Sequence, residues 1–294
     1  MLNKIRVHQA IYVILGLFLM LFNHQNAFFK ISDINSSLAI IFVIIMSLGV
    51  SHGASDSIVI WNAYSKIKTR AIAFLVYLSI VFLGLLVWFQ SPALGLVALI
   101  LMSIFHFGDS DLTYLKKVSQ MMKVSWGFAM TLLPVIFFEN DVKKIFDILV
   151  NFEINPNVFL ALKILTLFFS FSFLFLVYTS NVITKKDKIF LFLEFLITLI
   201  LASFLQPLFW FAFYFCFLHG IRALINLGIN SFRDLLFLII FTLPVTFFAY
   251  FVLFENLQIE YLNIIFSILM ALTISHMFWP AINRFLSNLL GEHK

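Results

Sequence analysis

Apolar runs of about 16–24 residues, separated by short polar loops, recur along nearly the whole chain. Their apolar residues do not alternate with polar ones, which favours helices over strands. Hydrophobic residues make up 63% of the 294 residues and charged residues only 11%, whereas soluble domains are about a quarter charged. The sequence therefore predicts an all-α, polytopic integral membrane bundle that forms a single transmembrane domain over residues 1–294.

We predict about ten spans, within a range of roughly eight to ten, because each needs close to 20 apolar residues. The first and fifth are short enough to be tilted or interfacial. The first run lacks a small-residue cleavage site after it, so we expect a retained helix rather than a signal peptide. The ten spans cover residues 9–23, 37–60, 71–89, 92–110, 124–138, 158–178, 188–205, 207–227, 235–254 and 261–283.

Lysine and arginine are distributed very unevenly between the two sides of this topology. With the N-terminus inside, fourteen lie on the cytoplasmic side and three on the other, as the positive-inside rule requires. We therefore expect a multi-pass protein of the inner (cytoplasmic) membrane with both termini in the cytoplasm. The same loops explain the pI of about 9.3, so we expect no nucleic-acid partner. The fourteen are Lys4, Arg6, Lys66, Lys68, Arg70, Lys116, Lys117, Lys123, Lys185, Lys186, Lys188, Arg233, Arg284 and Lys294, and the three are Lys30, Lys143 and Lys144.

Four histidines lie inside these apolar spans: His52, His106, His219 and His276. An ionisable side chain is costly in the hydrocarbon layer and indicates a functional site. All four spans run from outside to inside, and the histidines lie about 12–15 residues from their starts, roughly 18–23 Å deep. A lone histidine would more simply bond a neighbouring helix, but four at one depth predict a shared metal site.

Acidic residues follow the first two of these histidines. Asp56 lies one turn after His52, and Asp109 and Asp111 follow His106. A carboxylate that accepts the second imidazole N–H fixes the tautomer of a metal-binding histidine, so we place all three aspartates around the metal ligands. The alternative for Asp109 and Asp111 is that they end a helix at the membrane interface.

Glycine and arginine complete the surroundings of the histidines. Arg222 lies one turn after His219, and we place it with the three aspartates around the metal ligands. Gly53, Gly108 and Gly220 each lie within two residues of a histidine, where the missing side chain lets a helix, ion or flat ligand approach the backbone.

The remaining histidines, His8, His24 and His293, are terminal or in loops, and we expect them to be solvated.

The donor set favours iron(II). Neutral imidazoles suit zinc, copper, iron or nickel, and the single cysteine, Cys216, rules out a site built from several thiolates. No Glu-x-x-His pair is present for a di-iron carboxylate centre. A four-histidine iron(II) site with open positions for oxygen fits best. Two bis-histidine haems are arithmetically possible, but haem pairs would normally lie at two depths.

The histidine motifs resemble the Brp/Blh family of membrane β-carotene 15,15′-dioxygenases over most of the chain. This resemblance implies an iron-dependent oxygenase that takes a carotenoid and O₂ and cleaves the central double bond of β-carotene into two retinals. Such retinals commonly supply a microbial rhodopsin. The motifs are His52-Gly53-x-x-Asp56, His106-Phe107-Gly108-x-x-Asp111, His219-x-x-Arg222 after an aromatic segment, and a late His276.

One position departs from the family pattern. The family's third motif usually reads His-Ser-x-Arg-His, whereas this chain has Ala223 in place of the second histidine. If His276 serves as the fourth ligand, the site survives. If the missing histidine is a ligand, the chain has a weakened site, another substrate or no dioxygenase activity.

An aromatic run just before His219 is the best local candidate for a wall that contacts a polyene. Its members are Trp210, Phe211, Tyr214 and Phe215. Ordinary packing or lipid-facing aromatics explain the run equally well, and the forty phenylalanines of the chain are more simply a compositional bias.

Two other functions remain open from the sequence. One is a histidine-lined transporter of protons or divalent metal, although its entry loops should be acidic or histidine-rich and these are basic or short. The other is a non-catalytic carotenoid-binding relative, which Ala223 makes plausible. A hydrolase is poorly supported because no G-x-S-x-G element is present.

Overall fold

Every regular element in the part of the chain that the computed structural model describes is a helix, which confirms the all-α prediction. The structure describes residues 2–26, 41, 43–49, 53–229, 231–254 and 261–290. Within these ranges six helical segments are long and apolar enough to cross a membrane. They are Leu2–Leu21, Ile67–Gln90, Pro92–Leu112, Pro156–Thr179, Pro207–Leu227 and Tyr261–Leu289. The total of about ten spans and the cytoplasmic placement of both termini stay predictions.

The chain divides into two compact units. The first comprises the described residues of 1–41, 103–147 and 152–228, and the second those of 42–102, 148–151 and 229–294. Their boundaries fall inside helices α6 and α9, so each unit is built from segments far apart in sequence. The prediction of a single domain over 1–294 is not tested by this division.

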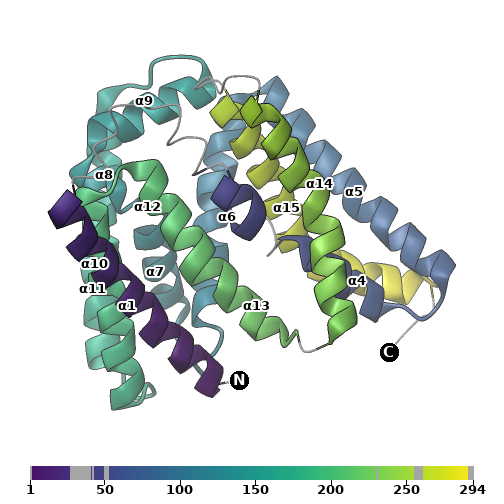
Figure 1. The fold of residues 1–294 in the computed structure, drawn as a ribbon, viewed down its shortest axis with the longest axis horizontal. Coiled ribbons are helices and arrows are strands. Elements are labelled where there is room, and N and C mark those ends of the chain that lie inside the picture. Colours follow the sequence, from purple (N-terminus) through teal and green to yellow (C-terminus); the bar gives the residue numbers. More distant parts are fainter. Residues whose placement is uncertain are drawn as a thin grey trace. The chain divides into compact units, whose positions relative to one another are not determined.

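The first unit contains the helices that carry two of the four histidines (Figure 1). Its elements are α1 (Leu2–Asn26), the end of α6 (Pro92–Leu112), α7 (Gln120–Leu132), α8 (Pro134–Phe137), most of α9 (Glu139–Val150), α10 (Pro156–Thr179), α11 (Lys185–Phe204), α12 (Pro207–Phe213), the π-helix η2 (Tyr214–Gly220) and α13 (Ile221–Leu227). Helix α1 packs along α11. The core includes Phe173, which stacks on Phe195 with ring centroids 5.3 Å apart and meets the Trp126 ring at a tilt, with centroids 5.0 Å apart.

Helices α6 and α7 touch backbone to backbone, which fixes the helix that carries His106. A Cβ atom on Gly127 would overlap the carbonyl oxygen of Ile104, and one on Gly108 would overlap that of Lys123. Only glycine fits at these two positions without a shift of the helices. The expectation that Gly108 allows a helix to approach closely is therefore confirmed.

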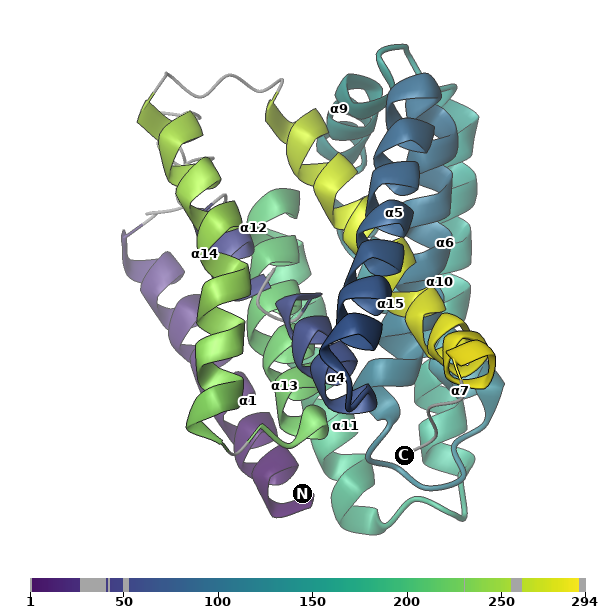
Figure 2. The same cartoon turned by 90° about the vertical axis from the view of Figure 1, so that its right-hand side faces the viewer.

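The second unit is built around the crossing of α5 and α15 (Figure 2). Its elements are η1 (Ile45–Gly49), α4 (Asp56–Ala63), α5 (Ile67–Gln90), the start of α6, α14 (Phe232–Phe254) and α15 (Tyr261–Leu290). Gly84 makes the crossing close, since a Cβ atom there would lie 3.0 Å from Cα of Ala271. The Trp88 indole also donates to the Asn263 side-chain oxygen across 2.7 Å.

The first, second and fifth predicted spans illustrate how the helices differ from the sequence prediction. The first is longer than residues 9–23, because α1 begins at Leu2 and pairs its Arg6 with Asp187 on α11. The fifth, 124–138, is interrupted by Pro134, which lacks the N–H that a continuous helix needs. The second, 37–60, is divided in its described part into the π-helix η1 and a new α-helix that starts at Asp56. The short helix α9 was not predicted.

Candidate metal centre

Two of the four intramembrane histidines meet in the first unit. His106 lies on α6 and His219 on the π-helix η2, and their Nε2 atoms are 3.1 Å apart. The rings are nearly perpendicular, at 74°, with centroids 4.8 Å apart. His219 is fully buried and His106 half-buried. The pair therefore directs two imidazole nitrogens at one point.

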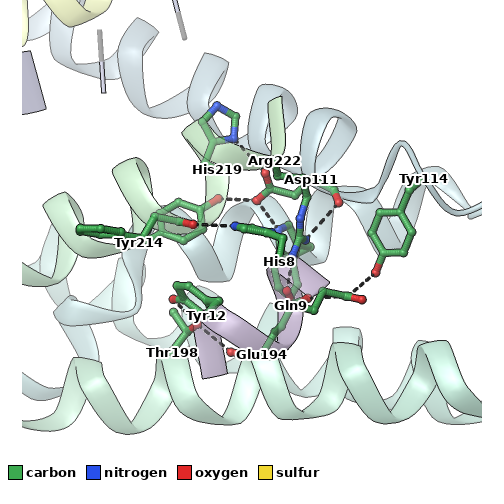
Figure 3. Close-up of polar contacts among 12 residues, drawn as sticks. His8, Gln9, Tyr12, Asp111, Tyr114, Glu194, Thr198, Tyr214, His219 and Arg222 are labelled. Atoms are coloured by element: carbon green, nitrogen blue, oxygen red, sulfur yellow. Dashed lines mark hydrogen bonds and ion pairs between the residues drawn. The ribbon is translucent and has the colours of Figure 1, made fainter. Parts of the chain in front are cut away.

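Asp111 holds His219 from the other side of its ring (Figure 3). One carboxylate oxygen accepts from His219 Nδ1 across 2.9 Å. The other oxygen accepts from the Trp126 indole at 2.9 Å and from the Tyr214 hydroxyl at 2.7 Å. Because an ionised carboxylate can only accept, Nδ1 of His219 carries its proton and Nε2 presents a lone pair. This is the tautomer that a metal-binding imidazole needs.

The distance between the two Nε2 atoms fits one bound metal ion. Two nitrogens about 2.1 Å from a common ion at a right angle would lie roughly 3.0 Å apart. In the absence of metal, His106 Nε2–H can donate to His219 Nε2. A metal ion that binds both nitrogens would displace the proton from His106 Nε2. Among the described residues no group of three or more histidine, cysteine or acidic side chains could hold a metal ion. The pair thus supplies two ligands, and the complete four-histidine set stays a prediction.

The second unit contains a similar arrangement around Asp56. One oxygen of its carboxylate lies 2.7 Å from His276 Nδ1, and the other accepts from the Tyr77 hydroxyl at 2.7 Å. Asp56 is buried, and 25% of the His276 side chain is exposed. In each unit one aspartate therefore binds both an imidazole Nδ1 and a tyrosine hydroxyl. His52 lies outside the described residues, so its place in a common site stays a prediction.

The two buried aspartates each bind a histidine on another helix. Asp111 follows His106 on the same helix but binds His219 of η2. The reason is geometric: residues five apart on an α-helix point about 140° away from each other. In the second unit Asp56 binds His276 of α15.

Asp109 pairs with a lysine rather than with either histidine of this pair. Its carboxylate is 56% exposed and forms an ion pair with Lys123 at 2.9 Å. This position matches the alternative interpretation, in which Asp109 is an interfacial residue near the end of its helix.

Arg222 supports Asp111 rather than an imidazole. Its guanidinium forms a fully buried ion pair with Glu194 of α11, and Nη1 donates to the backbone oxygen of Asp111 at 3.3 Å. The Gln9 amide nitrogen donates to Glu194 at 3.1 Å and to the Tyr114 hydroxyl at 2.9 Å. Burial, and then the Glu194 carboxylate, raises the pKa of the Tyr114 phenol, so this hydroxyl stays protonated.

Several residues around the centre were missed by the sequence analysis. Glu194 carries the same signal as the histidines, since it is a lone ionisable residue within an apolar run. Trp126 and Tyr77 carry no comparable signal. The expectation that His8 is solvated is wrong, because its side chain is buried and bonds the Phe217 carbonyl at 2.7 Å.

The side chain of His24 and all of His293 lie outside the described part of the chain.

The four candidate wall residues fall into two groups. Trp210 and Tyr214 are buried in the core, where the Trp210 indole donates to the Thr198 carbonyl at 2.9 Å. Phe211 and Phe215 are half-buried and stack at 5.2 Å, and Phe215 also stacks on the His219 ring at 5.8 Å. Phe215 is therefore the aromatic residue of this run best placed to cover the histidine pair.

A separate cavity of about 550 Å³ lies where α8 meets α9, beside Lys163 of α10. Phe137, Glu139 and Lys163 are among its lining residues. None of the site residues predicted from the sequence lines it.

Comparison with known proteins agrees with the motif resemblance. A family model described as beta-carotene 15,15'-dioxygenase matches residues 43–279, which is most of the chain. The chain belongs to this family. A protein named beta-carotene 15,15'-dioxygenase, from uncultured marine bacterium 66A03, is 31% identical over 189 residues, 61% of this chain. The alignment covers 65% of that relative's length. No solved structure matches.

The part of the chain that matches the dioxygenase family includes all four intramembrane histidines, Asp56 and Asp111. Helix α1, with His8 and Gln9, lies before it.

Proposed function

We propose that this protein is an iron-dependent dioxygenase that cleaves β-carotene, or a related carotenoid, at its central double bond to give retinal. The observation that carries the proposal is the His106–His219 pair, with Asp111 holding His219 as an Nδ1–H tautomer, inside the region that matches the family. A carotenoid dissolves in the bilayer, and a site on membrane-spanning helices meets its substrate there.

The proposed ligands of Fe(II) are Nε2 of His106 and His219, together with His52 and His276. When bound, the iron supplies binding and activation of O₂ next to an electron-rich alkene. Asp111 keeps the proton on Nδ1 of His219, so Nε2 stays a donor to the metal. Phe107 and Phe215 lie against the His219 ring, with centroids 4.6 and 5.8 Å away, and exclude water from that side.

The stoichiometry of the proposed reaction needs no reductant. One oxygen atom of O₂ joins each carbon of the broken double bond, so the two aldehydes account for both atoms and all electrons. The residues of the site therefore have to orient the alkene and exclude water from the metal rather than deliver protons. The product retinal would supply a partner such as a microbial rhodopsin, and the protein would lie in the inner membrane as a multi-pass protein.

Expression in bacteria that accumulate β-carotene tests this function. We expect the cells to bleach and retinal to appear in their extracts, because the carotenoid is cleaved. His219→Ala should abolish retinal formation, since it removes a ligand without changing the lipid-facing surface. Unchanged carotene with the parent protein present in the membrane would contradict the proposal and favour a non-catalytic carotenoid-binding relative.

A second prediction concerns Ala223, which is buried on α13 one turn after His219. If His276 is a ligand, Ala223→His should leave the iron affinity unchanged. It should lower stability by about 1–3 kcal/mol, because a larger side chain enters a packed site. Iron titration and thermal unfolding of the purified variant measure both effects. A clear gain in iron affinity and turnover would instead identify the family's missing histidine as a ligand and argue against His276.

A further inference from the structure

One face of helix α1 carries polar side chains that are buried in the first unit. His8, Gln9 and Tyr12 are at most 6% exposed, whereas Val7 on the same helix is 60% exposed. Polar groups inside a membrane bundle are costly unless they are hydrogen-bonded. These three side chains bond Phe217 of η2 and Glu194 and Thr198 of α11.

His8 bonds the helical segment that carries His219. Its Nε2–H donates to the carbonyl of Phe217 across 2.7 Å, two residues before His219. Phe217 lies within η2, a π-helix, a rare conformation that recurs at functional sites. His8 is buried, so bulk water cannot take the place of its N–H if that donor is removed. The Phe217 carbonyl would then lose this hydrogen bond without a replacement.

Gln9 reaches the same centre by a second route. Its amide nitrogen donates to the Glu194 carboxylate at 3.1 Å, and Glu194 forms the buried ion pair with Arg222. Arg222 in turn donates to the backbone oxygen of Asp111, the residue that holds His219 (Figure 3). Helix α1 therefore contacts both the segment that carries His219 and the ion pair that supports its aspartate.

We propose that α1, although it lies before the region that matches the family, is an integral part of the metal centre, and that His8 is its main positioning residue. His8 sets the place of η2 and so the direction of His219 Nε2, and Gln9 fixes the ion pair behind Asp111. The inference rests on the proposed function for the role of His219 as a ligand.

Two substitutions at His8 separate its hydrogen bond from its bulk. In His8→Gln, the amide nitrogen can occupy nearly the place of imidazole Nε2 and still donate to Phe217. In His8→Leu, an apolar side chain fills the space and cannot donate. Val7→Leu, on the exposed face of the same helix, is the matched control.

Titration of the full-length protein with Fe(II) and hydrogen–deuterium exchange of residues 214–220 are the two measurements. We expect His8→Leu to weaken iron binding about tenfold and to speed exchange in η2, since changes behind a ligand commonly cost that much affinity. His8→Gln and Val7→Leu should keep the parent values of both. If His8→Leu matched the parent in both measurements, or His8→Gln failed as badly as His8→Leu, the positioning role would be refuted.

Exchange also distinguishes this inference from the proposed function. If the parent protein bound no iron, the dioxygenase proposal would fall. Faster exchange of η2 in His8→Leu alone would still support the role of α1. If the parent bound no iron and exchange of η2 were equal in all four proteins, the role of α1 would be overturned.

Discussion

Replacing Arg222 with methionine is expected to destabilise the protein by about 3–5 kcal/mol, because it leaves the Glu194 carboxylate buried without a counter-charge. Both side chains are fully buried, and Arg222 also donates to the backbone oxygen of Asp111. The Gln9 amide still donates to Glu194 in this variant, but one neutral hydrogen bond does not replace a guanidinium. Denaturant unfolding in detergent, followed by tryptophan fluorescence, measures the loss.

The double variant Arg222→Met with Glu194→Met is the control for this prediction. Replacing both members of a buried ion pair by apolar residues of similar size is often close to neutral. We therefore expect the double variant to recover most of the stability that the single variant loses. If Arg222→Met alone were as stable as the parent, Glu194 would not be a buried charge and the arrangement around Asp111 would be wrong.

Asp111→Asn is expected to weaken iron binding by about 100-fold, at the upper end of the effects seen for residues behind a metal ligand. The Trp126 indole and the Tyr214 hydroxyl both donate to one side-chain oxygen of residue 111. These two donors fix the asparagine amide oxygen in that place and turn its NH₂ group toward His219. Nδ1 of His219 must then accept, so Nε2 carries the proton and cannot bind metal.

Iron titration of the purified variant measures this effect, with retinal formation as a second readout. Asp109→Asn, two residues away, makes the same chemical change in an exposed ion pair, and such pairs contribute about 1 kcal/mol or less to stability. We expect it to keep the parent iron affinity. Equal losses in the two variants would contradict the assignment of Asp111 as the residue that sets the tautomer.

The fold class follows from the sequence because the length and continuity of the apolar runs leave helices as the simplest solution. The sequence predicts the first and last residues of the helices less accurately. The break at Pro134 is visible in the sequence, but the polar start of α1 is not, because it depends on the pairing of Arg6 with Asp187 far along the chain. Hydrophobicity alone also does not reveal α9, whose sequence mixes charged and apolar residues.

The site residues were found through the cost of placing ionisable groups among apolar residues. That argument identifies His106, His219 and Asp111 but not which carboxylate binds which imidazole. The pairing depends on helix packing: Asp111 points away from His106 on its own helix and meets His219 on another. His8 was misjudged for the same reason, since its position near the chain end reveals nothing of the π-helix that it contacts.

The most direct test of the metal centre is the iron content of the purified protein after anaerobic loading with Fe(II). The parent, His106→Ala, His219→Ala and the exposed-face control Val7→Leu are compared by elemental analysis. The proposed centre predicts one iron per chain in the parent and in Val7→Leu, and almost none in either histidine variant. Full iron content in His106→Ala or His219→Ala would show that the metal is held elsewhere and would contradict the account.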